Sequence, residues 1–271
     1  MDEKEKNKKF YEAAYNFLRD ESSQNGIDEN CIKLYLSPIS SEKLTLNHIY
    51  YQLAFSAQNR QQSNNAIGGV IGGVEKLGKV LGWFDVNFVR NEFGNDDSKL
   101  LGAIQSTFIE LKDINQDKKG LWPQYCKSLL SGAEYLSSFK DGKAFVDFVN
   151  RYHKDDQALD KLPELIEEKV FGFGIPLACD FLKELGFVRY AKPDVHIKDI
   201  LSAYGFISGG ESDLEILNKL QSMAEDAGVS CYAFDKVLWL IGSGKFYKHG
   251  IKINGTKDGF MKKAKSFLEN H

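Results

Sequence analysis

One segment of the chain places a carboxylate where it could take part in chemistry. In KPDVHIKDIL, residues 192–201, Pro193 fixes the approach of the chain and Asp194 opens an expected helix. Aspartate is a common N-cap, because its side chain accepts hydrogen bonds from the first N–H groups of a helix. A carboxylate held there could also stabilise positive charge or activate a water molecule. The two roles are compatible, and the segment alone does not decide between them.

A second segment, VFGFGIPLA at 170–178, could bind an anion. A helix that ends near Lys169 meets a tight turn, and another helix follows. We expect Gly172 and Gly174 to adopt positive φ, so that successive backbone N–H groups converge on one point. Amides in front of a helix N-terminus suit one backbone phosphate. Phe171 and Phe173 are expected to be buried and to anchor the turn.

Basic residues gather after Gly242, although the net charge of the chain is −3. Between Gly242 and Lys265 the only acid is Asp258, and the lysines are Lys245, Lys248, Lys252, Lys257, Lys262, Lys263 and Lys265. Such a surface fits a polyanion, because phosphate binding depends on local charge. A solvated C-terminal helix explains the same lysines equally well.

The elements that must position these residues are helical. Apolar residues recur near the helical period in the segments 44–58, 68–84, 98–114, 121–139, 142–153, 176–187, 196–206, 213–228 and 232–244. No sustained alternation of period two is present, so the sequence predicts an all-α fold. The glycines of GGVIGGVEKLG (68–78) lack the order of a phosphate loop and are interpreted as sites of close helix contact.

The composition is that of an ordinary globular protein, with 42% apolar and 27% charged residues in 271. We find neither a signal-peptide pattern nor an apolar run of membrane-spanning length, and expect a cytoplasmic protein, nucleoid-associated if it is bacterial. The 4 cysteines are far apart in sequence, which argues against a zinc or iron–sulfur site and favours reduced, buried thiols. We expect no metal and no cofactor.

The turn and the aspartate together carry a resemblance. VFGFGIPLA resembles the hydrophobic-Gly-hydrophobic-Gly-x-x-x-Ala hairpin, with Ala178 at the small position, and PDVHI resembles a VDTHI-like segment with an essential aspartate. Both patterns are typical of the helix–hairpin–helix (HhH-GPD, endonuclease-three-like) DNA glycosylase superfamily. Pro176 matches the hairpin position where many members have a lysine, and it lies 18 residues before Asp194, as the superfamily pattern requires.

Two more segments agree in order. YYQLAFSAQNRQQSNNA (50–66) resembles an early helix of the superfamily, and DKVLWLIGSGKF (235–246) resembles a late one. The resemblance implies an all-α, two-lobed fold with a cleft between the lobes. We expect residues 44–180 to form a barrel-like lobe of six helices that ends in the hairpin. Residues 1–43 and 181–271 would form the second lobe, with the Asp194 loop and the basic C-terminal region.

The resemblance also implies an activity on double-stranded DNA that contains a damaged or modified base. The base is rotated out of the stack, and Asp194 stabilises the oxocarbenium-like sugar while its bond to the base breaks. His196 is expected to be structural. Gln58 or Asn59 is a candidate to fill the gap left in the duplex, although a polar helix end is an equal alternative.

Further DNA contacts are expected from the hairpin residues and from the basic stretch, represented by Lys245 and Lys248. Tyr50, Tyr51, Trp83, Trp122 and Trp239 are candidate walls for the extruded base, although most aromatic residues at helical spacing belong to a core.

One departure from the superfamily pattern bears on mechanism. Bifunctional members form a Schiff base with the hairpin lysine, whereas Pro176 has no amine, and Lys169 and Lys183 are not at the matching position. We therefore expect a monofunctional glycosylase that hydrolyses the N-glycosidic bond. Separately, we expect the protein to be a monomer. The alternatives are a non-catalytic DNA-binding protein and a bifunctional glycosylase/AP lyase that uses another lysine.

Overall fold

The computed structural model describes residues 2–60, 66–111, 114 and 117–270. Residues 61–65 of the segment 50–66, and residues 112–113 of the expected helix 98–114, lie outside these ranges. The chain divides into two compact units. Unit 1 comprises Met1–Ile39 with Gly186–His271, and unit 2 comprises Ser40–Leu185. The bounds expected from the sequence were 1–43 with 181–271 for the first of these and 44–180 for the second.

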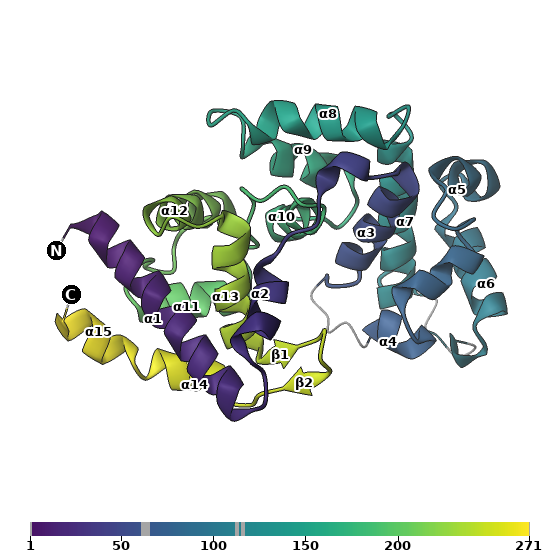
Figure 1. The fold of residues 1–271 in the computed structure, drawn as a ribbon. Coiled ribbons are helices and arrows are strands. Elements are labelled where there is room, and N and C mark those ends of the chain that lie inside the picture. The colour runs from purple at the N-terminus through teal and green to yellow at the C-terminus, as the bar shows by residue number, and fades with distance from the viewer. Residues whose placement is uncertain (1, 61–65, 112–113, 115–116, 271) are drawn as a thin grey trace. The chain divides into compact units, whose positions relative to one another are not determined.

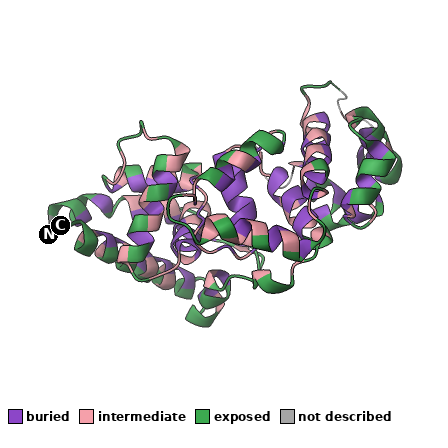
Figure 2. Ribbon diagram, turned by 90° about the horizontal axis from the view of Figure 1, so that it is seen from above, coloured by how far each residue is buried: buried purple, intermediate pink, exposed green. Residues whose placement is uncertain are grey.

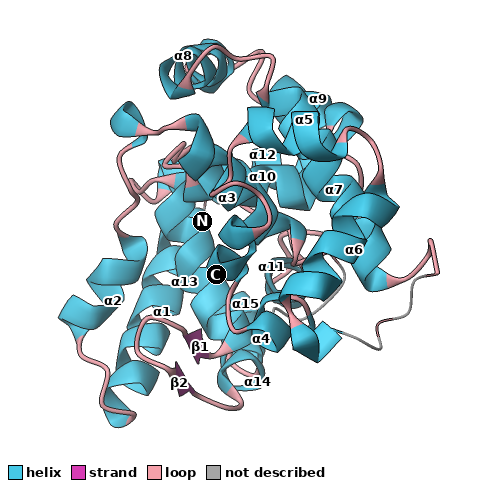
Figure 3. Ribbon diagram, turned by 90° about the vertical axis from the view of Figure 1, so that its right-hand side faces the viewer, coloured by secondary structure: helices cyan, strands magenta, loops and turns pink. Residues whose placement is uncertain are grey.

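Unit 1 is helical apart from one short hairpin (Figures 1 and 3). Its elements are α1 (Glu3–Gln24), α2 (Glu29–Leu36), α11 (Val195–Ala203), α12 (Asp213–Asp226), α13 (Cys231–Ser243), β1 (Lys245–Phe246), β2 (Ile251–Lys252), α14 (Thr256–Met261) and α15 (Ala264–Asn270). The antiparallel strands pair Lys245 with Lys252 and Phe246 with Ile251. Because the structure assigns no other strand in the described ranges, the predicted all-α fold is confirmed.

The core of unit 1 forms around Phe10 of α1, whose side chain has no exposed surface. The Phe10 ring lies 5.0 Å from that of Tyr204, 4.8 Å from that of Phe206 and 6.2 Å from that of Phe234. These rings come from segments far apart in the sequence. Apolar burial therefore joins the N-terminal helix to the C-terminal part of the chain.

Unit 2 contains the remaining helices. They are η1 (Ser41–Lys43), α3 (Leu46–Ala57), α4 (Gly68–Ile71), η3 (Val74–Lys79), α5 (Val86–Phe93), α6 (Asp97–Thr107), η4 (Ile109–Leu111), α7 (Leu121–Leu136), α8 (Gly142–His153), α9 (Lys161–Lys169) and α10 (Ile175–Glu184). Buried residues lie on the inward faces of these helices (Figure 2).

The centre of unit 2 is the contact between α3 and α7. Gly132 of α7 permits a close approach, since a Cβ there would lie 2.5 Å from the Leu53 side chain. Two buried hydroxyls connect the helices: Tyr50 Oη donates to the Leu129 carbonyl at 2.9 Å, and Tyr125 Oη donates to the Ala54 carbonyl at 2.9 Å. Their polar ends are satisfied, so both rings can be buried.

The expected helix over 68–84 is wrong in detail. It is interrupted after the single turn α4, because Gly72 (φ 75°) and Gly73 (φ 127°) adopt backbone conformations that end a right-handed helix. Close contact occurs at Gly68, where a Cβ would lie 2.6 Å from Gln58 Oε1. These glycines therefore serve a turn as well as a close contact.

The described helices include none with the length and apolarity needed to cross a bilayer. The 4 cysteines, all within the described ranges, form no disulfide.

Candidate functional site

Asp194 caps α11 through one oxygen of its carboxylate. Oδ1 accepts the N–H of His196 at 2.9 Å and the N–H of Ile197 at 3.2 Å. Within the described ranges, no hydrogen bond to the other oxygen, Oδ2, is found, and the side chain is only half-buried. The capping interpretation is thus correct, and it leaves one carboxylate oxygen able to face a substrate.

The segment before Asp194 is attached to α13. The backbone N–H of Lys192 donates to Oδ1 of Asp235, a fully buried residue, at 2.8 Å. Seven residues further along α13, Gly242 packs against His196, where a Cβ would lie 2.5 Å from the His196 Cβ. Residues seven apart share one face of a helix. One face of α13 therefore holds both sides of the Asp194 cap.

His196 is enclosed behind this cap. Its Nδ1 is buried and has no hydrogen-bond partner among the described residues. Burial lowers the pKa of His196, and the nearby carboxylate of Asp194 opposes this effect. Lys257, Asp199 and Lys245 also act on the imidazole electrostatically. An imidazole that is kept neutral and packed on Gly242 agrees with the expected structural role.

The hairpin that connects α9 to α10 is a tight turn. Gly172 has the expected positive φ of 76°, and the N–H of Phe173 donates to the Val170 carbonyl at 3.1 Å. The expectation for Gly174 is wrong: its φ is −107°, in the extended conformation of an N-cap. No acceptor for the N–H groups of Gly172, Gly174 and Ile175 is found within the described ranges. Three open amides thus lie at the N-terminal end of α10.

The expectation that both hairpin phenylalanines are buried holds only for Phe173, which is 4% exposed. Phe171 is 40% exposed, because its ring lies beside two cations rather than in the core. Arg60 is 5.3 Å from the ring centroid and Lys127 is 5.7 Å from it. Lys127 also has a carboxylate neighbour, Asp97, at 4.0 Å. The hairpin tip is therefore bordered by positive charge.

Two serines of α7 fix the hairpin backbone. Ser128 Oγ donates to the Phe171 carbonyl at 2.8 Å, and Ser131 Oγ accepts the Phe171 N–H at 2.8 Å. Sequence reasoning missed these serines as well as Arg60 and Lys127. For the residues of α7, the only signal in the sequence was Lys127 and Ser128 followed by Ser131 one helical turn later, and this pattern is not specific for any function.

The two candidates for filling a gap in the duplex are packed inside unit 2. Gln58 is 2% exposed, and its Oε1 accepts the N–H of Gly68 at 3.2 Å. Asn59 is half-buried, and its buried Oδ1 has no partner among the described residues. The Gln58 amide is not presented at the surface in this conformation, and the role of both residues in DNA binding stays a prediction.

The two basic candidates lie near the β1–β2 hairpin of unit 1. Lys245 is exposed and directly opposite Lys252 in the ladder. Lys248 Nζ donates to the Leu34 carbonyl at 2.5 Å and lies 5.2 Å from the Tyr35 ring centroid. Like charges opposite each other repel, and an anion would relieve that repulsion. Asp194 and these lysines belong to unit 1; the hairpin glycines, Gln58 and Asn59 belong to unit 2.

The aromatic candidates separate by burial. Tyr50 and Trp122 are core residues at 0% and 4% exposure, Tyr51 and Trp239 are half-buried, and Trp83 is 71% exposed. Trp83 has a positive φ of 56°. Burial leaves Tyr51, Trp83 and Trp239 as candidates for contact with a base.

Comparisons with known proteins give evidence that is independent of the site geometry. No family model matches the chain. An 8-oxoguanine DNA glycosylase/AP lyase of Korarchaeum cryptofilum (strain OPF8) is 30% identical over 93 residues, which cover 32% of this chain and 44% of that protein. This chain thus matches less than half the length of that relative.

One solved structure is also similar. It is an 8-oxoguanine glycosylase/lyase of Methanocaldococcus jannaschii in complex with a 15mer DNA containing 8-oxoguanine. The alignment covers 88% of this chain and 98% of that chain, with 18% identity and a TM-score of 0.48.

These comparisons correct one expectation. The sequence relative is named as a glycosylase/AP lyase, which contradicts the expectation of a monofunctional glycosylase. The position of Pro176 is a poor guide to lyase chemistry, because it excludes an amine at one site only. The hairpin and the Asp194 cap agree with the pattern expected from the helix–hairpin–helix DNA glycosylases, and over 93 residues the chain is similar to an 8-oxoguanine DNA glycosylase/AP lyase.

Proposed function

We propose that this protein is a bifunctional DNA glycosylase/AP lyase that excises 8-oxoguanine from duplex DNA and then cleaves the abasic strand. The observation that carries the proposal is the match of 30% identity over 93 residues to an 8-oxoguanine DNA glycosylase/AP lyase. The half-buried Asp194 and the open amides of the hairpin support it, because they supply two of the functions that such an enzyme needs.

The first function is stabilisation of a sugar cation. Departure of the base leaves positive charge on C1′ and the ring oxygen, and a fixed carboxylate nearby lowers the energy of that state. In our proposal the Oδ2 atom of Asp194 takes this role, while Oδ1 stays bound to the N–H groups of His196 and Ile197. Because the cap holds the carboxylate rigidly, little reorganisation is needed at the moment of reaction.

The second function is binding of the DNA backbone. The N–H groups of Gly172, Gly174 and Ile175 would donate to one phosphate, and the cations of Arg60 and Lys127 would neutralise it. Lys245 and Lys248 would contact further phosphates. Such contacts provide affinity and fix the position of the duplex, but they do not discriminate between bases.

The test of the glycosylase step is the variant Asp194→Asn. Asparagine is as good an N-cap as aspartate, so the fold and the DNA affinity should be retained. Loss of the negative charge should slow the release of 8-oxoguanine by about 10²–10³-fold. Single-turnover base release and fluorescence anisotropy on the same lesion-bearing duplex measure the two properties separately.

The outcomes distinguish the candidate functions. A wild-type protein that binds duplex DNA but releases no base from any lesion would be a non-catalytic DNA-binding protein. Excision by Asp194→Asn at the wild-type rate would remove Asp194 from the mechanism. A panel of duplexes with other oxidised, alkylated or deaminated bases tests whether 8-oxoguanine is the preferred substrate.

A further inference from the structure

We infer that Lys236 supplies the amine for the lyase step, forming a Schiff base with C1′ of the abasic sugar. This inference rests on the lyase half of the proposed function, which requires an amine that Pro176 cannot provide. Lys236 lies on α13 of unit 1, the unit that carries Asp194.

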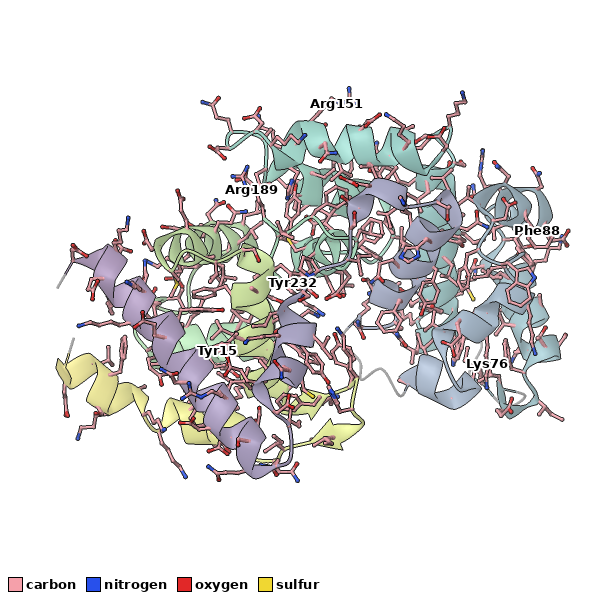
Figure 4. All side chains as sticks on the ribbon, in the orientation of Figure 1. Tyr15, Lys76, Phe88, Arg151, Arg189 and Tyr232 are labelled. Carbon is pink, nitrogen blue, oxygen red and sulfur yellow. The ribbon has the colours of Figure 1, made fainter. Side chains whose placement is uncertain are left out.

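The surroundings of Lys236 are unusual for a lysine. The residue is 4% exposed, and its Nζ lies close to three aromatic rings. The ring centroids of Tyr232, Trp239 and Tyr247 are 5.4, 5.9 and 5.6 Å away, and Tyr247 Oη is 3.4 Å from Nζ. Tyr232 is labelled on α13 in Figure 4. Lysines are rarely buried, and buried lysines are enriched in roles that use the amine chemically.

This aromatic cage suits the intermediate of the reaction. After the Nζ ammonium gives a proton to water, its lone pair attacks C1′ of the ring-opened abasic sugar. The hydroxyl group formed at C1′ is protonated and leaves as water, and the nitrogen becomes a cationic iminium. Loss of a C2′ proton then expels the 3′ phosphate by β-elimination, and water finally hydrolyses the imine to release the enzyme. Aromatic faces attract cations, so rings that stabilise the ammonium also stabilise the iminium on the same nitrogen.

The helix that carries Lys236 is attached to the segment before Asp194. Asp235, the neighbour of Lys236, accepts the backbone N–H of Lys192 at 2.8 Å, two residues before Asp194. The cage and the Asp194 cap are therefore both fixed to α13. A common rigid element can position an amine and a carboxylate for one sugar, and α13 offers such an element within unit 1.

Two exposed or half-buried lysines of unit 1 form ion pairs with carboxylates. Lys198 Nζ is 2.5 Å from Asp213 Oδ1, and Lys257 pairs with Asp199. Lys245 is exposed and lies opposite another lysine, which suits contact with phosphate.

Access to the amine depends on Tyr247. Tyr247 is 51% exposed, Trp239 is half-buried and Tyr232 is 5% exposed, so Tyr247 is the most exposed ring of the cage. It lies in the turn between β1 and β2. Rotation of this one side chain would expose the amine without opening the helical core.

The experiment needs no mutation. Wild-type protein is incubated with a duplex that contains an abasic site, in the presence of sodium borohydride, which reduces a Schiff base to a stable secondary amine. We expect a covalent complex, and peptide mapping by mass spectrometry should locate the adduct on Lys236. An adduct on Lys183, on Lys245, on the N-terminal amine or elsewhere overturns this inference but leaves the proposed function intact.

Lys236→Arg provides the second test. Arginine keeps the positive charge and the cation–π contacts, but its guanidinium stays protonated and is no nucleophile. We expect this variant to remain folded, bind the duplex and lose trapping. The control Lys33→Arg, at an exposed residue of α2 paired with Glu29, should trap like the wild type. Trapping by Lys236→Arg overturns the inference. If the wild type releases 8-oxoguanine but forms no covalent complex with DNA in borohydride, both this inference and the lyase half of the proposed function are wrong.

Discussion

Gly242→Ala is the substitution for which the structure gives the sharpest expectation. A Cβ at this position would lie 2.5 Å from the His196 Cβ and 3.0 Å from its Cγ. The His196 Cβ is attached directly to the backbone of α11, so rotation of the side chain cannot remove the overlap. Either α13 or the first turn of α11 must move, and that turn carries Asp194.

Two effects of the added methyl group oppose each other. Alanine favours a helix over glycine by about 1 kcal/mol. Overpacking of a filled site costs about 1–3 kcal/mol. The net change in the free energy of unfolding is therefore a loss of about 0–2 kcal/mol. A displacement of the carboxylate by about 1 Å can reduce the rate about 10²-fold. The expected signature is a large loss of activity with a small loss of stability.

The assay combines single-turnover release of 8-oxoguanine with thermal unfolding. Gly102→Ala is the matched control, because Gly102 also lies within a helix, α6, and has no atom within 4 Å of the added Cβ. This control should be more stable by about 0.5–1 kcal/mol and equally active. If Gly242→Ala gains stability like the control and excises at the wild-type rate, the packing of α13 does not position Asp194.

The remaining predictions concern the hairpin and His196. Gly172→Ala should weaken duplex binding, because alanine at φ 76° is strained by about 1–2 kcal/mol, whereas Gly174→Ala, with φ −107° and no atom nearer than 3.7 Å, should bind normally; equal losses in fluorescence anisotropy would contradict this. Arg60→Gln and Lys127→Gln should each make the negative slope of log binding constant against log salt concentration shallower by about 0.9. An unchanged slope would show that the residue does not contact a phosphate. Burial lowers the pKa of His196, so its contribution to the free energy of unfolding should be complete above the unfolded-state value of 6.5 and decrease as pH falls toward the lowered folded-state pKa. Urea unfolding between pH 7.5 and 5 should show a smaller loss of stability for His196→Gln than for the wild type, and parallel curves would refute the assignment.

The sequence was sufficient wherever a feature depends on neighbours along the chain. The cap by Asp194 followed from residue type and helical period, because an N-cap bonds to N–H groups two or three residues away. The positive φ of Gly172 followed from the tight turn for the same reason. Gly174 was misjudged, because a glycine that precedes a helix can equally be an extended N-cap, and the residue type does not distinguish the two.

Contacts between distant segments were beyond the sequence. Phe171 was expected in the core, yet it lies beside Arg60 and Lys127, which are 111 and 44 residues away in the chain. Gln58 was a candidate to fill a gap in the duplex, yet its side chain accepts the N–H of Gly68 in the interior of unit 2. Periodicity indicates which face of a helix is apolar, but it does not indicate which other segment covers that face.

The sequence by itself determined that the chain is helical and that no lysine occupies position 176. It also determined that a glycine hairpin precedes the N-cap aspartate Asp194 by a fixed number of residues. The tertiary structure alone decided that α13 holds both sides of the Asp194 cap and surrounds Lys236 with aromatic rings. The physical reason is one of range. Caps and turns depend on bonds between residues a few positions apart, whereas the burial of an amine among rings depends on packing between segments that only the folded chain brings together.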